Sequence, residues 1–128
     1  MPKKILIADD EPDVLEVIQF RLSKRGYTVI LAANGQEALE SINRERPDLV
    51  ILDFRMPLLD GFQVCQRLKE DENLKNIPVI ILSASSDVLS EEKLLAAHAD
   101  GALKKPFEPE ELFRIVDKFL KSEGEPDA

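Results

Sequence analysis

Cysteine and long apolar runs are scarce in this chain of 128 residues. Its one cysteine, Cys65, has no partner for an internal disulfide, which favours a reducing compartment such as the cytoplasm. No apolar run approaches the roughly 20 residues that a membrane-spanning helix needs. The apolar run at residues 5–8 is too short for a secretory signal peptide. We therefore expect a cytoplasmic chain that makes no use of a membrane.

Glycine-rich phosphate loops are also missing. The chain has neither the lysine loop of P-loop nucleotidases nor a G-x-G-x-x-G run, which argues against a nucleotide-binding domain. The net charge of −8 repels nucleic-acid phosphates, so we expect no direct nucleic-acid binding and favour a basic protein surface as partner.

The length favours one domain with a real core, which we place at residues 1–121. Residues 122–128 are polar and contain glycine and proline, so they are predicted to be a tail or the start of a linker.

Short apolar runs alternate with amphipathic stretches along the whole chain. Several of the runs are continuous rather than alternating, which is typical of parallel strands covered on both faces. Between them, apolar residues recur at helical spacing. The predicted strands lie at residues 5–8, 28–32, 49–52, 79–82 and 102–103. This order predicts an α/β fold, a doubly wound sheet with helices on both faces.

Helix start signals agree with this order. Proline suits the first helical position, and an N-cap residue is often followed three residues later by a reciprocal Glu or Gln. The signals are Pro12 and Pro109, and the pairs Asn34 with Glu37 and Asp60 with Gln63.

Polar side chains stand where the predicted strands end. They are Asp9, Asp10, Asp53, Ser83 and Lys105. Ligands of doubly wound sheets bind at the carboxyl ends of the strands, so we expect these groups to meet there. Three close carboxylates repel one another unless a cation joins them, and Mg²⁺ commonly binds through carboxylates plus a phosphate.

The same cluster has the parts for an aspartyl phosphate. An aspartate can act as the nucleophile when cations neutralise the phosphoryl oxygens, a charge that Lys105 could supply. The hydroxyl of Ser83 could donate to a phosphoryl oxygen and so sense it. Taken singly, each aspartate could instead be a turn residue or helix cap; the joint placement favours chemistry.

Taken together, these stretches resemble the receiver domain of response regulators in two-component signalling. The resemblance covers residues 3–121 and rests on residues 5–11 (Ile-Leu-Ile-Ala-Asp-Asp-Glu), 49–57, 60–61, 79–84 and 104–107. It implies a flavodoxin-like, five-stranded parallel sheet in the order 2-1-3-4-5 with five flanking helices.

The resemblance also implies roles for the acidic residues. Asp53 would be the phosphoacceptor, loaded from a histidine kinase or a histidine phosphotransfer protein. Asp10, Asp53 and the backbone carbonyl of Arg55 would bind Mg²⁺ or Mn²⁺ directly, and Asp9 would act through water. Beyond its own phosphorylation and dephosphorylation the chain would not be an enzyme.

Ser83 would be the switch hydroxyl, and Lys105 the phosphate-binding cation, with a cis bond to Pro106. Phosphorylation would change the binding of a downstream protein through the face of helix four (around Leu94 and Leu95), strand five (residues 102–103) and helix five (residues 112–120). The sequence leaves open a phosphorylation-dependent dimer.

Four positions depart from the family pattern or vary within it. Ala102 stands where an aromatic residue is common, so the output would travel through movement of the backbone and helix four, or through another residue. His98 replaces a glycine near the end of helix four, a position that suits a left-handed backbone. Arg55 and Ser85 would flank the pocket at positions that tune the lifetime of the phosphoryl group.

Other functions stay open at this point. The chain could be an interaction module that is never phosphorylated, or a receiver cut from a transcription factor, a hybrid kinase or a cyclase. A haloacid-dehalogenase-type phosphatase fits poorly, because the residue two after Asp53 is Arg55 and strand one is followed by Asp9-Asp10 rather than Asp-x-Asp.

Overall fold

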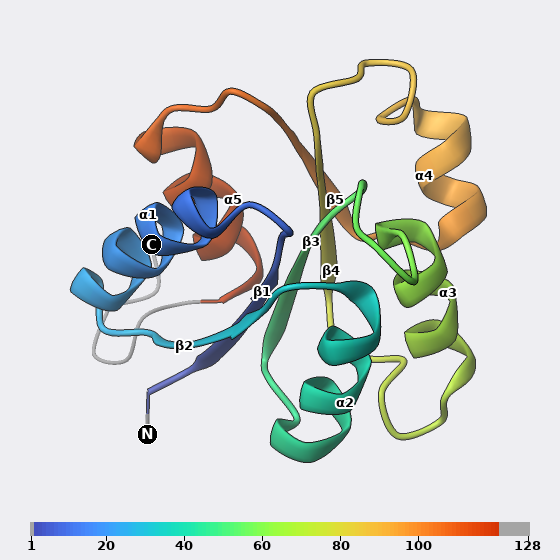
Figure 1. Ribbon diagram of the computed structural model, residues 1–128, viewed down its shortest axis with the longest axis horizontal. Coiled ribbons are helices and arrows are strands. Elements are labelled where there is room, and N and C mark those ends of the chain that lie inside the picture. The colour runs from blue at the N-terminus through green and yellow to red at the C-terminus, as the bar shows by residue number, and fades with distance from the viewer. Residues whose placement is uncertain (1, 121–128) are drawn as a thin grey trace.

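The computed structural model describes residues 2–120 and shows one parallel sheet between two layers of helices (Figure 1). Its five strands are ordered β2-β1-β3-β4-β5, as predicted. The strands are β1 (Lys4–Ala8), β2 (Thr28–Ala32), β3 (Leu49–Asp53), β4 (Val79–Ser83) and β5 (Gly101–Lys104). The helices are α1 (Pro12–Lys24), α2 (Gly35–Glu45), α3 (Gly61–Glu70), α4 (Glu91–Ala97) and α5 (Pro109–Phe119). The predicted tail at 122–128 lies outside the described residues.

The two faces of the sheet carry separate cores. Ile5 and Ile7 of β1 pack with the apolar sides of α1 and α5, whereas Leu6 and Ala8 pack with α2 and α3. Figure 1 shows the same division, with α1 and α5 on one side and α2, α3 and α4 on the other. Because successive side chains of a strand point to opposite faces, a strand buried on both must be apolar throughout. This explains the continuous apolar runs.

Local signals place the helix starts as predicted. Pro12 and Pro109 stand in the first turns of α1 and α5. The side chain of Asn34 accepts a hydrogen bond from the Glu37 N–H, and Asp60 and Gln63 form a reciprocal capping box. Such caps satisfy backbone N–H groups that have no partner inside the helix.

Strand ends differ slightly from the prediction. Asp53 and Ser83 are the last residues of β3 and β4 rather than the residues after them. The fifth strand begins at Gly101, one residue early, and ends at Lys104, just before Lys105. Pairing continues past that end, because the Lys105 N–H donates to the Ser83 carbonyl at 2.9 Å. Sheet pairing therefore fixes the backbone from which the polar side chains of Asp53, Ser83 and Lys105 project.

No helix among the described residues is long and apolar enough to cross a membrane.

His98 caps α4 with a left-handed backbone at φ 62° and ψ 31°. This is the conformation that glycine adopts most easily at a helix end. For other residues it costs roughly 1–2 kcal/mol.

Replacing His98 by glycine should therefore stabilise the fold by about 0.5–1 kcal/mol, after the greater chain entropy of glycine is subtracted. Urea unfolding measures this as a higher midpoint. The matched control is Ala96→Gly, an exposed position inside the same helix, which should lower the midpoint. A lower midpoint for His98→Gly would contradict the strain argument.

Candidate functional site

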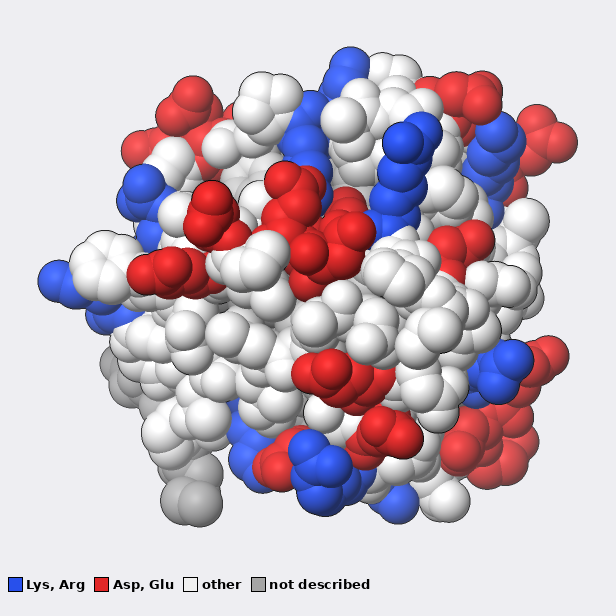
Figure 2. All heavy atoms as spheres, viewed as in Figure 1, with Lys and Arg blue, Asp and Glu red and all other residues white. Residues whose placement is uncertain are grey.

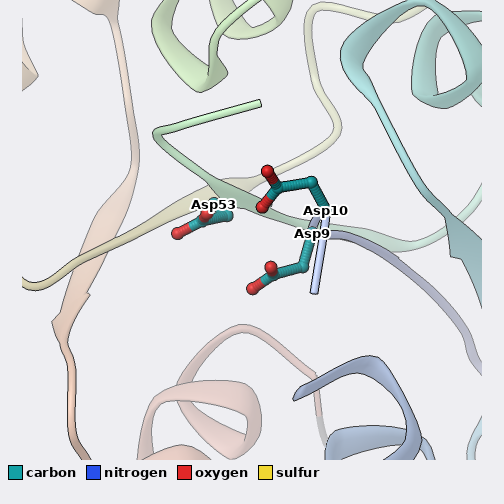
Figure 3. Close-up of side chains that lie close together, drawn as sticks. All are labelled: Asp9, Asp10 and Asp53. Atoms are coloured by element: carbon teal, nitrogen blue, oxygen red, sulfur yellow. The ribbon is translucent and has the colours of Figure 1, made fainter. Parts of the chain in front are cut away.

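Three aspartates meet at the carboxyl edge of the sheet. Asp9 and Asp10 follow β1, and Asp53 ends β3, the strand next to β1. One carboxylate oxygen from each lies within 4.8 Å of the others. Figure 3 shows the three side chains gathered around a common space. Asp9 and Asp53 are buried, whereas Asp10 is exposed, so the cluster opens to solvent on one side.

One lysine pairs with both buried carboxylates. The Lys105 Nζ lies 2.8 Å from Asp9 Oδ2 and 2.9 Å from Asp53 Oδ1. Asp9 is held from a second side, because its Oδ1 accepts the backbone N–H of Glu11 at 2.9 Å. Both oxygens of Asp9 are thus engaged, which fixes its carboxylate in place.

The predicted switch hydroxyl lines the same cleft. Ser83 is buried, and its Oγ accepts the backbone N–H of Ser85 at 3.1 Å. A serine hydroxyl can still donate its hydrogen while it accepts. Other residues around the cleft include Asp10, Asp53, Arg55 and Lys105.

Several predicted details can be checked directly. The Lys105-Pro106 bond is cis, as expected. Arg55 is exposed, and it and Ser85 line the cleft, as predicted. Ala102 of β5 pairs with Ile81 of β4 and carries only a methyl group, so no aromatic side chain is available at this position.

Comparison with known proteins decides the family. A sequence model of the response regulator receiver domain matches residues 5–117. This chain belongs to the response regulator receiver domain family. It is 44% identical over 119 residues to the probable transcriptional regulator ycf27 of Porphyridium aerugineum, covering 93% of the chain and 48% of that protein.

Another relative is the alkaline phosphatase synthesis transcriptional regulatory protein PhoP of Bacillus subtilis (strain 168). It is 37% identical over 121 residues, covering 94% of this chain and 50% of the relative. The receiver thus spans about half the length of the curated relatives it matches.

Solved receivers share the fold. The chemotaxis protein CheY4 of Vibrio cholerae matches with a TM-score of 0.88 and 30% identity, covering 94% of this chain and 100% of that one. The receiver of sensor histidine kinase PA1611 from Pseudomonas aeruginosa PAO1, with a magnesium ion in its active-site cleft, matches at 0.86 with 34% identity and coverages of 95% and 100%. TrrA of Thermotoga maritima, in complex with Mg²⁺-BeF, matches at 0.83 with 36% identity and coverages of 92% and 99%.

Gly61 allows α3 to begin close to the acidic cluster, a role that was not predicted from the sequence. A Cβ on Gly61 would lie 2.7 Å from the Asp53 carbonyl oxygen, so no larger residue fits without movement. The Gly61 N–H also donates to the Phe54 carbonyl at 2.9 Å. The Asp60-Gly61 pair of the family pattern marked this position, but only the fold shows the close approach.

The charged groups of the acidic cluster shift the pKa values of Asp53 and Lys105. Burial raises the pKa of Asp53 above 3.8, repulsion from Asp9 and Asp10 adds to this, and Lys105 opposes it. Burial alone would lower the pKa of Lys105, but hydrogen bonds to Asp9 and Asp53 outweigh it and raise that pKa. Lys105 therefore stays a cation at neutral pH.

The raised pKa of Asp53 predicts a pH dependence of stability. Just above pH 3.8 the native carboxyl keeps a proton that the unfolded chain has lost, so the free energy of unfolding falls as pH rises through that window. Asp53→Asn removes this loss, so the free energy of unfolding of the variant relative to the wild type should grow as pH rises above 3.8.

Urea unfolding of both proteins across this range tests the shift. Glu40→Gln, which neutralises an exposed carboxylate on α2, is the control and should show no such growth. An advantage for Asp53→Asn that shrinks as pH rises would mean that the pKa is lowered instead.

Proposed function

We propose that this receiver accepts a phosphoryl group on Asp53 from a phosphohistidine of a histidine kinase or a histidine phosphotransfer protein, and thereby changes its binding to a downstream protein. The observation that carries the proposal is the double ion pair of Lys105 with Asp9 and Asp53 beside an open cleft. An ammonium and a nucleophilic carboxylate side by side are the groups that phosphoryl transfer to an aspartate needs.

The donor set fits a hard divalent cation. Mg²⁺ and Mn²⁺ prefer oxygen ligands, and three carboxylates converge here. Asp10, Asp53 and the backbone carbonyl of Arg55 would hold the ion, with Asp9 acting through water. When bound, the ion would neutralise charge on the phosphoryl oxygens and on the crowded carboxylates.

The transfer itself is carried by Asp53. Its deprotonated carboxylate oxygen forms a bond to phosphorus while the bond from phosphorus to the donor's imidazole nitrogen breaks, and the electron pair stays with that nitrogen. Lys105 stabilises the negative charge on the phosphoryl group. We propose no catalysis beyond this reaction and the hydrolysis of its product, and we place the chain in the cytoplasm.

Ser83 would couple the phosphoryl group to the loop after β4. Its hydroxyl hydrogen is available to a phosphoryl oxygen, and its Oγ is tied to the Ser85 N–H, so a movement of Ser83 pulls that loop. A charge-assisted hydrogen bond contributes roughly 1.5–3 kcal/mol, whereas a full switch needs about 5.5 kcal/mol. Lys105 and the metal ion must therefore contribute as well.

The output would reach a partner through the face of α4, β5 and α5. The longer relatives named as transcriptional regulators support an output in transcription, exerted by a fused or separate protein rather than by nucleic-acid contacts of this domain. The rival is an interaction module that is never phosphorylated, and the two experiments below separate them.

Phosphorylation predicts a specific loss in one variant. Wild type incubated with acetyl phosphate and Mg²⁺ should gain one phosphoryl group by intact mass, and Asp53→Asn should gain none. Glu40→Gln is the charge-matched control and should be labelled like the wild type. Labelling of Asp53→Asn at the wild-type level would refute the acceptor assignment.

Metal binding predicts a gain in thermal stability. A ligand at a hundred times its Kd stabilises a fold by about 2.7 kcal/mol, so the Tm should rise with Mg²⁺ concentration. The rise should be strongly reduced in Asp10→Asn and kept in Glu40→Gln, because only the former lies in the cluster. An equal rise in all three proteins would point to a general salt effect.

A further inference from the structure

Leu58, in the loop between β3 and α3, combines two unusual properties. Its side chain is 73% exposed, and its backbone has φ 74°. A positive φ is a genuine outlier for a bulky residue. The Leu59 N–H donates to the Pro57 carbonyl at 2.9 Å, which closes a three-residue γ-turn with Leu58 at its centre. Turns of this kind with positive φ are rare and strained.

The turn is held by its surroundings. The Gly35 N–H at the start of α2 approaches the Pro57 carbonyl at 3.5 Å. A side chain at Gly35 would overlap the Leu59 backbone, so the loop lies directly against α2. On the other side, the Asp60 capping box begins α3. A leucine is thus kept in a left-handed conformation, although it is exposed and glycine would fit at lower cost.

Other exposed apolar residues lack this combination. Among the described residues, the large exposed hydrophobic side chains are Val17, Phe20, Leu58 and Leu95. The other three lie within α1 and α4 and have no positive φ. Strain kept at a surface position indicates a role for the side chain itself.

The position of Leu58 indicates which partner would use it. It follows Asp53 by five residues on the loop that leaves the acidic cluster, and Arg55 of the same loop lines the cleft. A protein that brings a phosphoryl group to Asp53 must lie over this rim. The exposed charged groups here include Asp10, Glu11 and Asp13 beside Arg55. Figure 2 shows a patch of acidic side chains on this face of the molecule, flanked by Lys and Arg side chains.

We propose that Leu58 is a preorganised anchor that inserts into an apolar recess of the phosphodonor protein, beside its phosphohistidine and within a basic rim. The inference rests on the proposed function. Charge would steer the two proteins together, whereas a single rigid apolar side chain in a pocket would set the register and the specificity. Leu58 would contribute to recognition of a protein donor and not to the chemistry at Asp53.

The variant Leu58→Gly tests this role, because it should make the fold more stable and yet make transfer from a protein donor slower. It should raise the urea midpoint by removing the strain. Transfer from a protein donor, chosen as the fastest of a panel of autophosphorylated histidine kinases, should fall by roughly tenfold in kcat/KM. Labelling by acetyl phosphate should stay at the wild-type rate.

Two further variants serve as controls. Leu58→Met keeps an apolar side chain and should restore most of the transfer from the kinase. Leu95→Ala removes a leucine of similar exposure from α4 and should accept the phosphoryl group like the wild type. Unchanged kinase transfer by Leu58→Gly would overturn the proposal, as would an equal loss with acetyl phosphate. Failure of the proposed function would appear differently, as wild type that acetyl phosphate does not label.

Discussion

The double ion pair of Lys105 organises the whole site. One ammonium, on the residue just after β5, pairs with two buried carboxylates, one directly after β1 and one at the end of β3. A buried charge without a partner is strongly destabilising, so neither Asp9 nor Asp53 could be kept in this position alone. The backbone of Lys105 is itself held by the carbonyl of Ser83. Lys105 therefore connects Asp53, Asp9 and the backbone of Ser83 in one network.

The balance of charge in the acidic cluster also bears on the proposed reaction. Three carboxylates and one ammonium leave an excess of negative charge at the rim. Burial and the neighbouring aspartates raise the pKa of Asp53, so its charged form is less stable here than in water. In the proposed reaction, a divalent cation and the Lys105 ammonium would relieve this repulsion and then stabilise the phosphoryl group. The same charges thus serve the resting domain and the proposed reaction.

Much of this could be predicted from sequence, because parallel strands buried on both faces must be apolar and must end at a common edge. The strand order, the Asp60 cap and the positions of Asp53 and Ser83 all follow from that pattern. The sequence predicts that Lys105 meets the aspartates, but not that its one ammonium pairs with both Asp9 and Asp53, since this depends on how three strands end in space. Nor does anything local favour a positive φ at Leu58, which is imposed by the packing of its loop against Gly35.

The central claim is that Asp53 accepts the phosphoryl group within a cluster prepared by Lys105. A crystal structure grown with Mg²⁺ and beryllofluoride, a phosphoryl mimic for carboxylates, tests it most directly. The account predicts the mimic on the Asp53 carboxylate, in contact with Lys105 Nζ and Ser83 Oγ, with the metal ion held by Asp10. The mimic on another residue, or a metal ion away from the three aspartates, would contradict it.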